Sequence, residues 1–162
     1  MGTNQVSYAL YDDVALDSAA VGIQSSTSPY LPSGFLVGQY CLSLQYGVVD
    51  YGFGAASIAQ TAQLPADAQS IQFRGTYPFT VSFDGTIVPL IVLSSQTGYS
   101  VYGGDISQFA GRTGELLITS YTHFSYLDAI QFSTQTVPEP SSLVLFMIGF
   151  GLLYYRPWRL RR

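Results

Sequence analysis

The sequence predicts an all-β protein, a jelly-roll-like two-sheet sandwich followed by a single C-terminal transmembrane helix. Over residues 1–137, short runs of alternating apolar and polar residues are separated by Gly, Pro, Asp and Ser, and no long segment has helical periodicity. The 13 tyrosines and 10 phenylalanines supply ample ring area for a sandwich core. Residues 143–155 form an uncharged apolar run of a different kind, which predicts the helix. The chain therefore divides into a β-sandwich domain, 1–137, and a tail, 138–162.

The expected strands share an alternation of period two, with one apolar face and one polar face. They cover residues 39–45, 57–64, 70–74, 79–83, 86–93, 98–102, 115–120 and 127–133. Asp84-Gly85 predicts a tight hairpin turn, because glycine tolerates a positive φ. Pro89 makes the run 86–93 an edge or bulged strand, because proline donates no ladder hydrogen bond. Residues 106–110 predict one short helical turn, and an opening strand is only faintly indicated near 6–14.

Charge is distributed unevenly along the chain. Only 10% of the residues are charged, against roughly 25% in an average soluble domain. Residues 1–137 hold two arginines and nine acidic residues, a formal charge of −7, whereas residues 138–162 hold four arginines and one glutamate, a charge of +3. An acidic body without lysine argues against nucleic acid as a partner, because nucleic-acid binding depends on basic side chains that neutralise phosphates.

The tail combines a short apolar run with a basic end. As a helix, residues 143–155 span roughly 20 Å, which is short of the roughly 30 Å of a bilayer core. Local thinning of the bilayer and snorkelling arginines compensate for a short span. A buried core helix is the alternative, and it is disfavoured because the run is apolar all round. We expect a membrane anchor with a cytoplasmic C-terminus, set by the arginines. The anchor residues are Leu143, Phe146, Gly149, Leu153, Arg156, Arg159, Arg161 and Arg162.

The order Val137-Pro138-Glu139-Pro140, apolar run, arginine cluster resembles the PEP-CTERM sorting domain. The resemblance implies that Pro138, Glu139 and Pro140 are recognised by an exosortase, a membrane protease-transpeptidase. It also implies that the helix and arginines hold the precursor in the inner membrane until the tail is removed. Mature proteins of this kind reach the cell surface or an extracellular polysaccharide matrix. Two prolines keep the tripeptide extended, which suits a protease.

Substrates of this family also carry a secretory signal peptide. Residues 1–20 contain no basic n-region and no apolar h-region. We therefore expect in-frame coding sequence upstream of Met1 that supplies such a signal.

A second resemblance concerns residues 35–133, whose order of segments is similar to galactose-binding-like jelly rolls. Leu127-Asp128-Ala129-Ile130 matches a pattern often seen in their final strand. The resemblance implies a fold more than a function. In such jelly rolls the first and last strands can be neighbours and share a structural calcium, which makes Asp12, Asp13 and Asp128 candidate ligands, with Asp17 nearby. The alternative is that these are solvated turn aspartates.

The sequence favours no catalytic site. His123 is the single histidine and Cys41 the single cysteine, which excludes metal sites built on clusters of these residues. No serine has the surroundings of a nucleophile elbow. Glu115 is the only glutamate of the body, and the aspartates mostly fall at turns. We expect no enzymatic activity and no cofactor other than the calcium considered above.

Two classes of function remain. The first is a structural component displayed at the cell surface or in the extracellular matrix. The second is a carbohydrate-binding module that retains the protein in exopolysaccharide. The only tryptophan, Trp158, lies in the tail. A sugar site in the body must therefore use tyrosines such as Tyr99, Tyr102, Tyr121 and Tyr126.

Overall fold

The computed structural model describes residues 9–11, 20–45, 48–49, 52–53, 55–122 and 124–137. Across these residues the secondary structure is almost entirely β, with thirteen strands and one short 3-10 helix. The strands fall into a seven-stranded sheet, a four-stranded sheet and a two-stranded ribbon.

The larger sheet has the strand order β1-β2-β3-β13-β7-β11-β10. Its neighbours are antiparallel except for β1 and β2, which run parallel. The strands are β1 (Ala9–Tyr11), β2 (Ala20–Ser25), β3 (Tyr40–Gln45), β13 (Ser125–Ser133), β7 (Ser70–Gly75), β11 (Tyr99–Asp105) and β10 (Leu90–Gln96).

The smaller sheet is antiparallel, with the order β6-β12-β8-β9. Its strands are β6 (Ala56–Gln63), β12 (Thr113–Ser120), β8 (Thr80–Phe83) and β9 (Thr86–Val88). The ribbon pairs β4 (Val48–Val49) with β5 (Gly52–Phe53), and the helix η1 is Ser107–Phe109.

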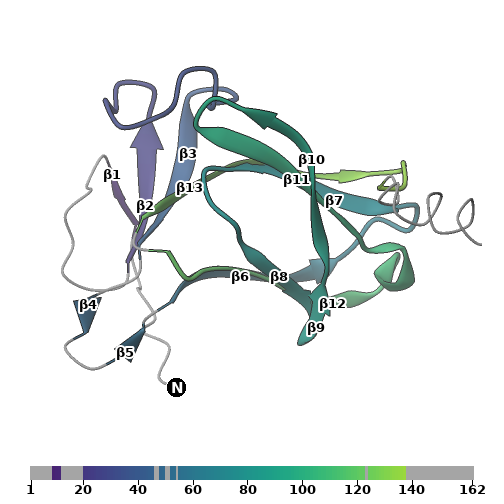
Figure 1. Ribbon diagram of the computed structural model, residues 1–162. Coiled ribbons are helices and arrows are strands. Elements are labelled where there is room, and N and C mark those ends of the chain that lie inside the picture. Colours follow the sequence, from purple (N-terminus) through teal and green to yellow (C-terminus); the bar gives the residue numbers. More distant parts are fainter. Residues whose placement is uncertain are drawn as a thin grey trace, which may run out of the picture.

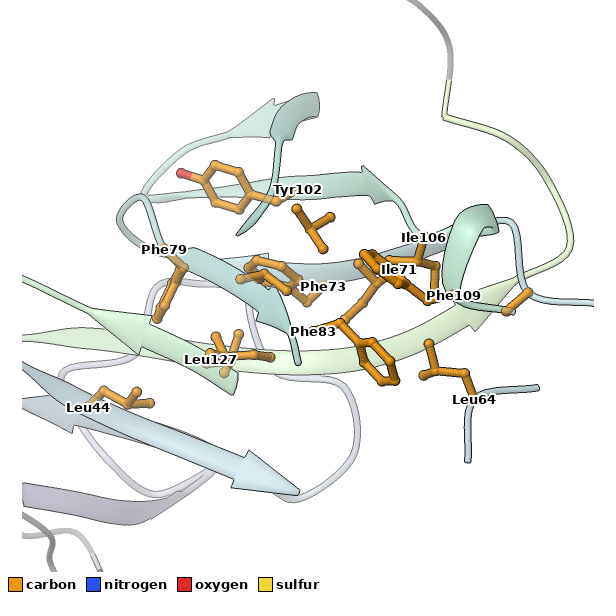
Figure 2. Packing of buried hydrophobic residues seen from close by; sticks show 14 of the residues in the cluster. Leu44, Leu64, Ile71, Phe73, Phe79, Phe83, Tyr102, Ile106, Phe109 and Leu127 are labelled. Atoms are coloured by element: carbon orange, nitrogen blue, oxygen red, sulfur yellow. The ribbon is translucent and has the colours of Figure 1, made fainter. Parts of the chain in front are cut away.

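The two sheets stack face to face, as Figure 1 shows with the smaller sheet beneath the larger one. One cluster of buried side chains fills the space between them. Ile71 and Phe73 enter it from the larger sheet, and Val81 and Phe83 enter it from the smaller one (Figure 2). Both pairs are spaced by two residues, because alternate side chains of a strand point to one face. The body is thus an all-β sandwich of two sheets, consistent with a jelly-roll-like fold.

Most of the predicted strands are confirmed to within a few residues. Asp84 and Gly85 have φ values of 47° and 75°, the positive values that a tight hairpin turn requires. The short helical turn is also confirmed, as η1. Strand β2 was not predicted. Along the described part of the chain, no helix has both the length and the apolar character needed to cross a bilayer. The transmembrane helix predicted for 143–155 lies outside the described residues.

The prediction of one strand over 86–93 is wrong. The run divides at Pro89 into β9, which ends in the smaller sheet, and β10, which begins in the larger one. Each is an edge strand of its own sheet, as expected of a run that contains proline. Pro89 therefore marks a corner at which the chain changes sheets.

A second cluster of apolar side chains lies on the outer face of the larger sheet. Leu127 points into the main core, whereas its neighbour Tyr126 belongs to the second cluster together with Phe35 and Cys41. The segment between β2 and β3, residues 26–39, supplies Phe35 and covers this face. We refer to this segment as the covering loop. It positions the candidate site described next.

Candidate functional site

The covering loop is tied to the sheet by two charged side chains. Nη1 of Arg74 on β7 donates hydrogen bonds to the carbonyl oxygens of Gly34 (2.9 Å) and Phe35 (2.8 Å). Oδ2 of Asp128 on β13 accepts a hydrogen bond from the backbone N–H of Val37 (2.6 Å). Arg74 and Asp128 lie opposite each other in the β7–β13 pairing. Hydrogen bonds to charged groups are stronger than neutral ones, so these contacts define the path of the loop.

Aromatic contacts hold the loop from the other side. The ring of Phe35, which is fully buried, meets Tyr99 edge to face at a centroid distance of 5.5 Å. The guanidinium of Arg74 lies over the Tyr99 ring, 5.5 Å from its centroid. Tyr126 contacts both Phe35 (6.1 Å) and Phe124 (4.8 Å). The loop is therefore a packed part of the fold.

An open cleft of about 600 Å³ lies beside this cluster. Its volume is within the range of about 300–1,000 Å³ that is usual for small-molecule sites. Five separate chain segments contribute to it: the covering loop, the end of β3, the β7–β8 connection, the β10–β11 turn and the start of β13. The lining residues are Tyr30, Pro32, Gln45, Thr76, Tyr77, Gly98, Phe124 and Tyr126. They include four aromatic rings and no charged side chain.

The covering loop and the β10–β11 turn meet closely at the cleft. A methyl group built on Gly98 would lie 2.9 Å from Cβ of Pro32, and Gly98 has a φ of 89°. Both the positive φ and the close approach require glycine at this position. In Figure 1 the covering loop and the β10–β11 hairpin lie side by side at the top of the view.

Tyr126 is the most deeply buried aromatic residue of the cleft, with 4% of its surface exposed. Its backbone N–H donates to Oγ1 of Thr76 at 2.9 Å. The hydroxyl oxygens of Tyr126 and Ser28 are both buried, and neither meets hydrogen-bond geometry with another described group. Burial above all, with the nearby Cys41 and Tyr30, raises the pKa of Tyr126 to about 12. The Ser28 hydroxyl is near enough to lower this pKa slightly without reaching hydrogen-bond geometry.

The tyrosines proposed from sequence for a sugar site are scattered. Only Tyr126 lines the cleft. Tyr102 is buried in the main core, stacked on Phe73 at 5.6 Å, and Tyr121 is exposed at the end of β12. Tyr99 packs beneath Arg74 in the second cluster.

Sequence analysis missed Tyr30, Tyr77 and Phe124 as cleft residues. Tyr30 and Tyr77 each stand next to a proline, in Pro29-Tyr30 and Tyr77-Pro78. Proline next to tyrosine in a connecting segment places the ring on a stiff, exposed piece of chain. This signal could have indicated both residues.

The calcium ligands proposed from sequence are not brought together in the described part of the chain. Asp12, Asp13 and Asp17 lie outside the described residues. The first strand is not next to the last, because β1 pairs with β2 and β13 pairs with β3 and β7. Among the described residues, no three His, Cys, Asp or Glu side chains are grouped as a metal site would need.

The carboxylate of Asp128 has backbone partners. Oδ2 binds the N–H of Val37, and Oδ1 accepts from the N–H of Ala129 at 2.7 Å. Asp84 and Asp105 likewise accept backbone N–H groups, from Glu115 (2.9 Å) and Ser107 (2.8 Å). Turn aspartates commonly bind backbone in this way, which is the alternative considered for them above. A calcium site that includes Asp128 stays a prediction.

The proposed sorting residues, Pro138, Glu139 and Pro140, and the eight anchor residues lie outside the described residues, as does His123. The described chain remains attached to the body almost up to this point. Ser70 Oγ donates to the carbonyl oxygen of Gln135 at 2.8 Å, and the Gln69 N–H donates to that of Ser133 at 2.8 Å. The tail therefore begins within three residues of the last of these contacts.

A comparison with known protein families matches residues 136–162 to the PEP-CTERM protein-sorting motif. The chain carries a PEP-CTERM sorting signal. A PEP-CTERM protein is exported, processed by an exosortase and sorted to the cell envelope. Comparisons with curated proteins and with solved structures found no match. The PEP-CTERM match covers the tail alone, so the role of the sandwich has to be argued from its own surface.

Proposed function

We propose that this chain is a non-enzymatic structural protein of the cell surface or the extracellular matrix. Its precursor is held in the inner membrane by residues 143–155 and the arginine cluster, and exosortase removes the tail. The observation that carries the proposal is the PEP-CTERM motif at 136–162. A charge-poor β-sandwich suits display outside the cell, since its stability rests on an apolar core rather than on ion pairs.

The position of the motif supports processing of a folded substrate. The last strand, β13, ends at Ser133, and hydrogen bonds attach the chain to the body as far as Gln135. Pro138 follows three residues later, and two prolines keep the tripeptide out of a helix. An extended, proline-flanked segment between a folded domain and a membrane anchor is accessible to a membrane protease.

The first prediction tests the sorting motif. Glu139→Ala leaves the apolar run untouched, so the precursor should still insert into the membrane. We expect the variant to remain full-length in the inner membrane, whereas the native chain is shortened. The measurement is the mass of the protein recovered from a host that carries the cognate exosortase.

Glu115→Ala is the matched control, because Glu115 is the only other glutamate and is exposed on β12. This variant should be processed like the native chain. A mature native protein that still contains residues 143–162 would refute processing and leave a simple C-terminal anchor. Equal processing of the Glu139 variant would remove the tripeptide from the recognition element.

The second candidate function is a carbohydrate-binding module that retains the protein in exopolysaccharide. The aromatic cleft favours this candidate, because aromatic faces combined with a few polar groups are a common lining of ligand sites. The two candidates are compatible, since a displayed protein can also bind the polymer around it.

A further inference from the structure

The cleft combines three features that together restrict the ligand. Its walls include the exposed rings of Tyr30 and Tyr77, which are 60% and 52% exposed. Its polar groups are hydroxyls and an amide, from Thr76, Tyr126 and Gln45. No charged side chain is among the lining residues. A ligand that fits has an apolar face for the rings and several uncharged hydrogen-bonding groups at its edge.

The Tyr126 hydroxyl indicates that hydrogen bonds belong to the interaction. Its oxygen is buried and has no hydrogen-bond partner among the described protein groups. Leaving such a hydroxyl unsatisfied costs about 1–3 kcal/mol. Native structures contain few such groups, and a functional role is one of their explanations. The ring cannot simply turn away, because Phe35 and Phe124 pack against it. A ligand that both donates and accepts hydrogen bonds would satisfy this hydroxyl.

We propose that the cleft binds a neutral sugar residue, with the rings of Tyr30 and Tyr77 against its C–H face and Tyr126 as a hydrogen-bonding partner. A pyranose has one face of C–H groups and an edge of hydroxyls that both donate and accept, which matches the lining. The formal charge of −7 over residues 1–137 disfavours acidic sugars through repulsion. The proposal rests on export as proposed above, because polysaccharide is met outside the cell.

Proline-rich peptide is a competing occupant, since aromatic grooves also accept such segments. Proline-rich segments offer carbonyl acceptors and almost no donors. They would leave the acceptor lone pairs of the Tyr126 and Ser28 hydroxyls unsatisfied. A sugar supplies donors as well, so the buried hydroxyls favour the sugar.

Binding can be tested on the full chain in a sugar-free zwitterionic detergent. Saturation-transfer NMR would follow methyl glycosides of glucose, galactose and mannose, with methyl glucuronide, cyclohexanol and decaproline as competing chemistries. We expect millimolar binding of at least one neutral glycoside and weaker binding of the other three probes. No binding of any neutral glycoside, or a preference for glucuronide, cyclohexanol or decaproline, would overturn the proposal.

Variants locate the site. Tyr126→Phe keeps the ring and should weaken binding about three- to tenfold, the range for one lost hydrogen bond. Its thermal midpoint should be unchanged or higher, because an unsatisfied hydroxyl is removed. Tyr77→Ala removes an exposed ring and should weaken binding on the order of tenfold. Tyr121→Ala, exposed outside the cleft, should bind like the native chain.

Neutral-glycoside binding that survives both Tyr126→Phe and Tyr77→Ala would place the sugar elsewhere and overturn the assignment of the cleft. The Tyr77→Ala precursor should be processed normally, because the sorting motif is intact. A failure of sugar binding and a failure of sorting are thus seen in separate measurements.

Discussion

Tyr126 shows how one residue serves packing and recognition at once. Its ring closes the second cluster against Phe35 and Phe124, its N–H binds Thr76, and its hydroxyl is buried beside the cleft. Phenylalanine would supply the same ring contacts without an unsatisfied oxygen. The hydroxyl is therefore better explained by recognition than by stability.

The alkaline stability of the protein should report on Tyr126. Burial raises the pKa of Tyr126 to about 12 from an ordinary value of 10.0, so the unfolded chain loses this proton first. Stability from this group is fully present below about pH 10 and is lost as the pH rises toward about 12. Urea midpoints measured across that window should fall less steeply for Tyr126→Phe than for the native chain. Tyr121→Phe is the exposed control, and an identical slope for Tyr126→Phe would contradict the prediction.

At the scale of elements, the corner between β9 and β10 explains two glycines that carry no signal in the sequence. Gly103 and Gly104 lie on β11, beside β10. A methyl group built on Gly104 would lie 2.6 Å from Cγ1 of Val88 and 3.0 Å from the carbonyl oxygen of Pro89. The absence of a side chain lets the proline corner approach the sheet, which allows the chain to pass from one sheet to the other.

Gly104→Ala should therefore destabilise the sandwich. The added methyl group meets a core side chain and a backbone oxygen, and overpacking of this kind costs about 1–3 kcal/mol. Urea unfolding measures the free energy of unfolding. Ser94→Ala, on the exposed edge strand β10, is the control and should change it by less than about 0.5 kcal/mol. An unchanged free energy for Gly104→Ala would show that the corner can relax.

Strand prediction succeeded where alternation is strong and failed where pairing decides. In β7 and β8 the apolar residues alternate cleanly, so their faces could be assigned from sequence. Strand β2, Ala20–Ser25, contains only short and polar residues besides Val21 and Ile23. Its pairing with β3 supplies the hydrogen bonds, from residues about twenty positions away along the chain. Pro89 signalled an edge correctly, but the change of sheet is a tertiary property.

For the whole molecule, body and tail should be separable. The two apolar clusters use residues between Leu31 and Leu127, and no member comes from beyond β13 in the described chain. The last contacts to the body are those of Ser133 and Gln135. A chain that ends at Val137 keeps all of them.

We expect the chain truncated after Val137 to fold as the full chain does. Its free energy of unfolding should differ by less than about 0.5 kcal/mol, because no core contact is removed. Urea denaturation followed by circular dichroism would measure this difference. A truncation to 131, which removes Ser133 and Gln135, is the comparison and should be less stable. Loss of structure in the longer chain would show that the tail contributes to the fold.

The sequence alone determined the β class and the sorting signal. Both are local, since alternation and the order of proline, apolar run and arginines are read along one stretch of chain. The cleft was decided only by tertiary structure. Its aromatic rings stand at Tyr30, Tyr77, Phe124 and Tyr126, and they meet because β13 lies between β3 and β7. Alternation shows which face of a strand is apolar, whereas the choice of neighbouring strand depends on the packing of the whole sandwich.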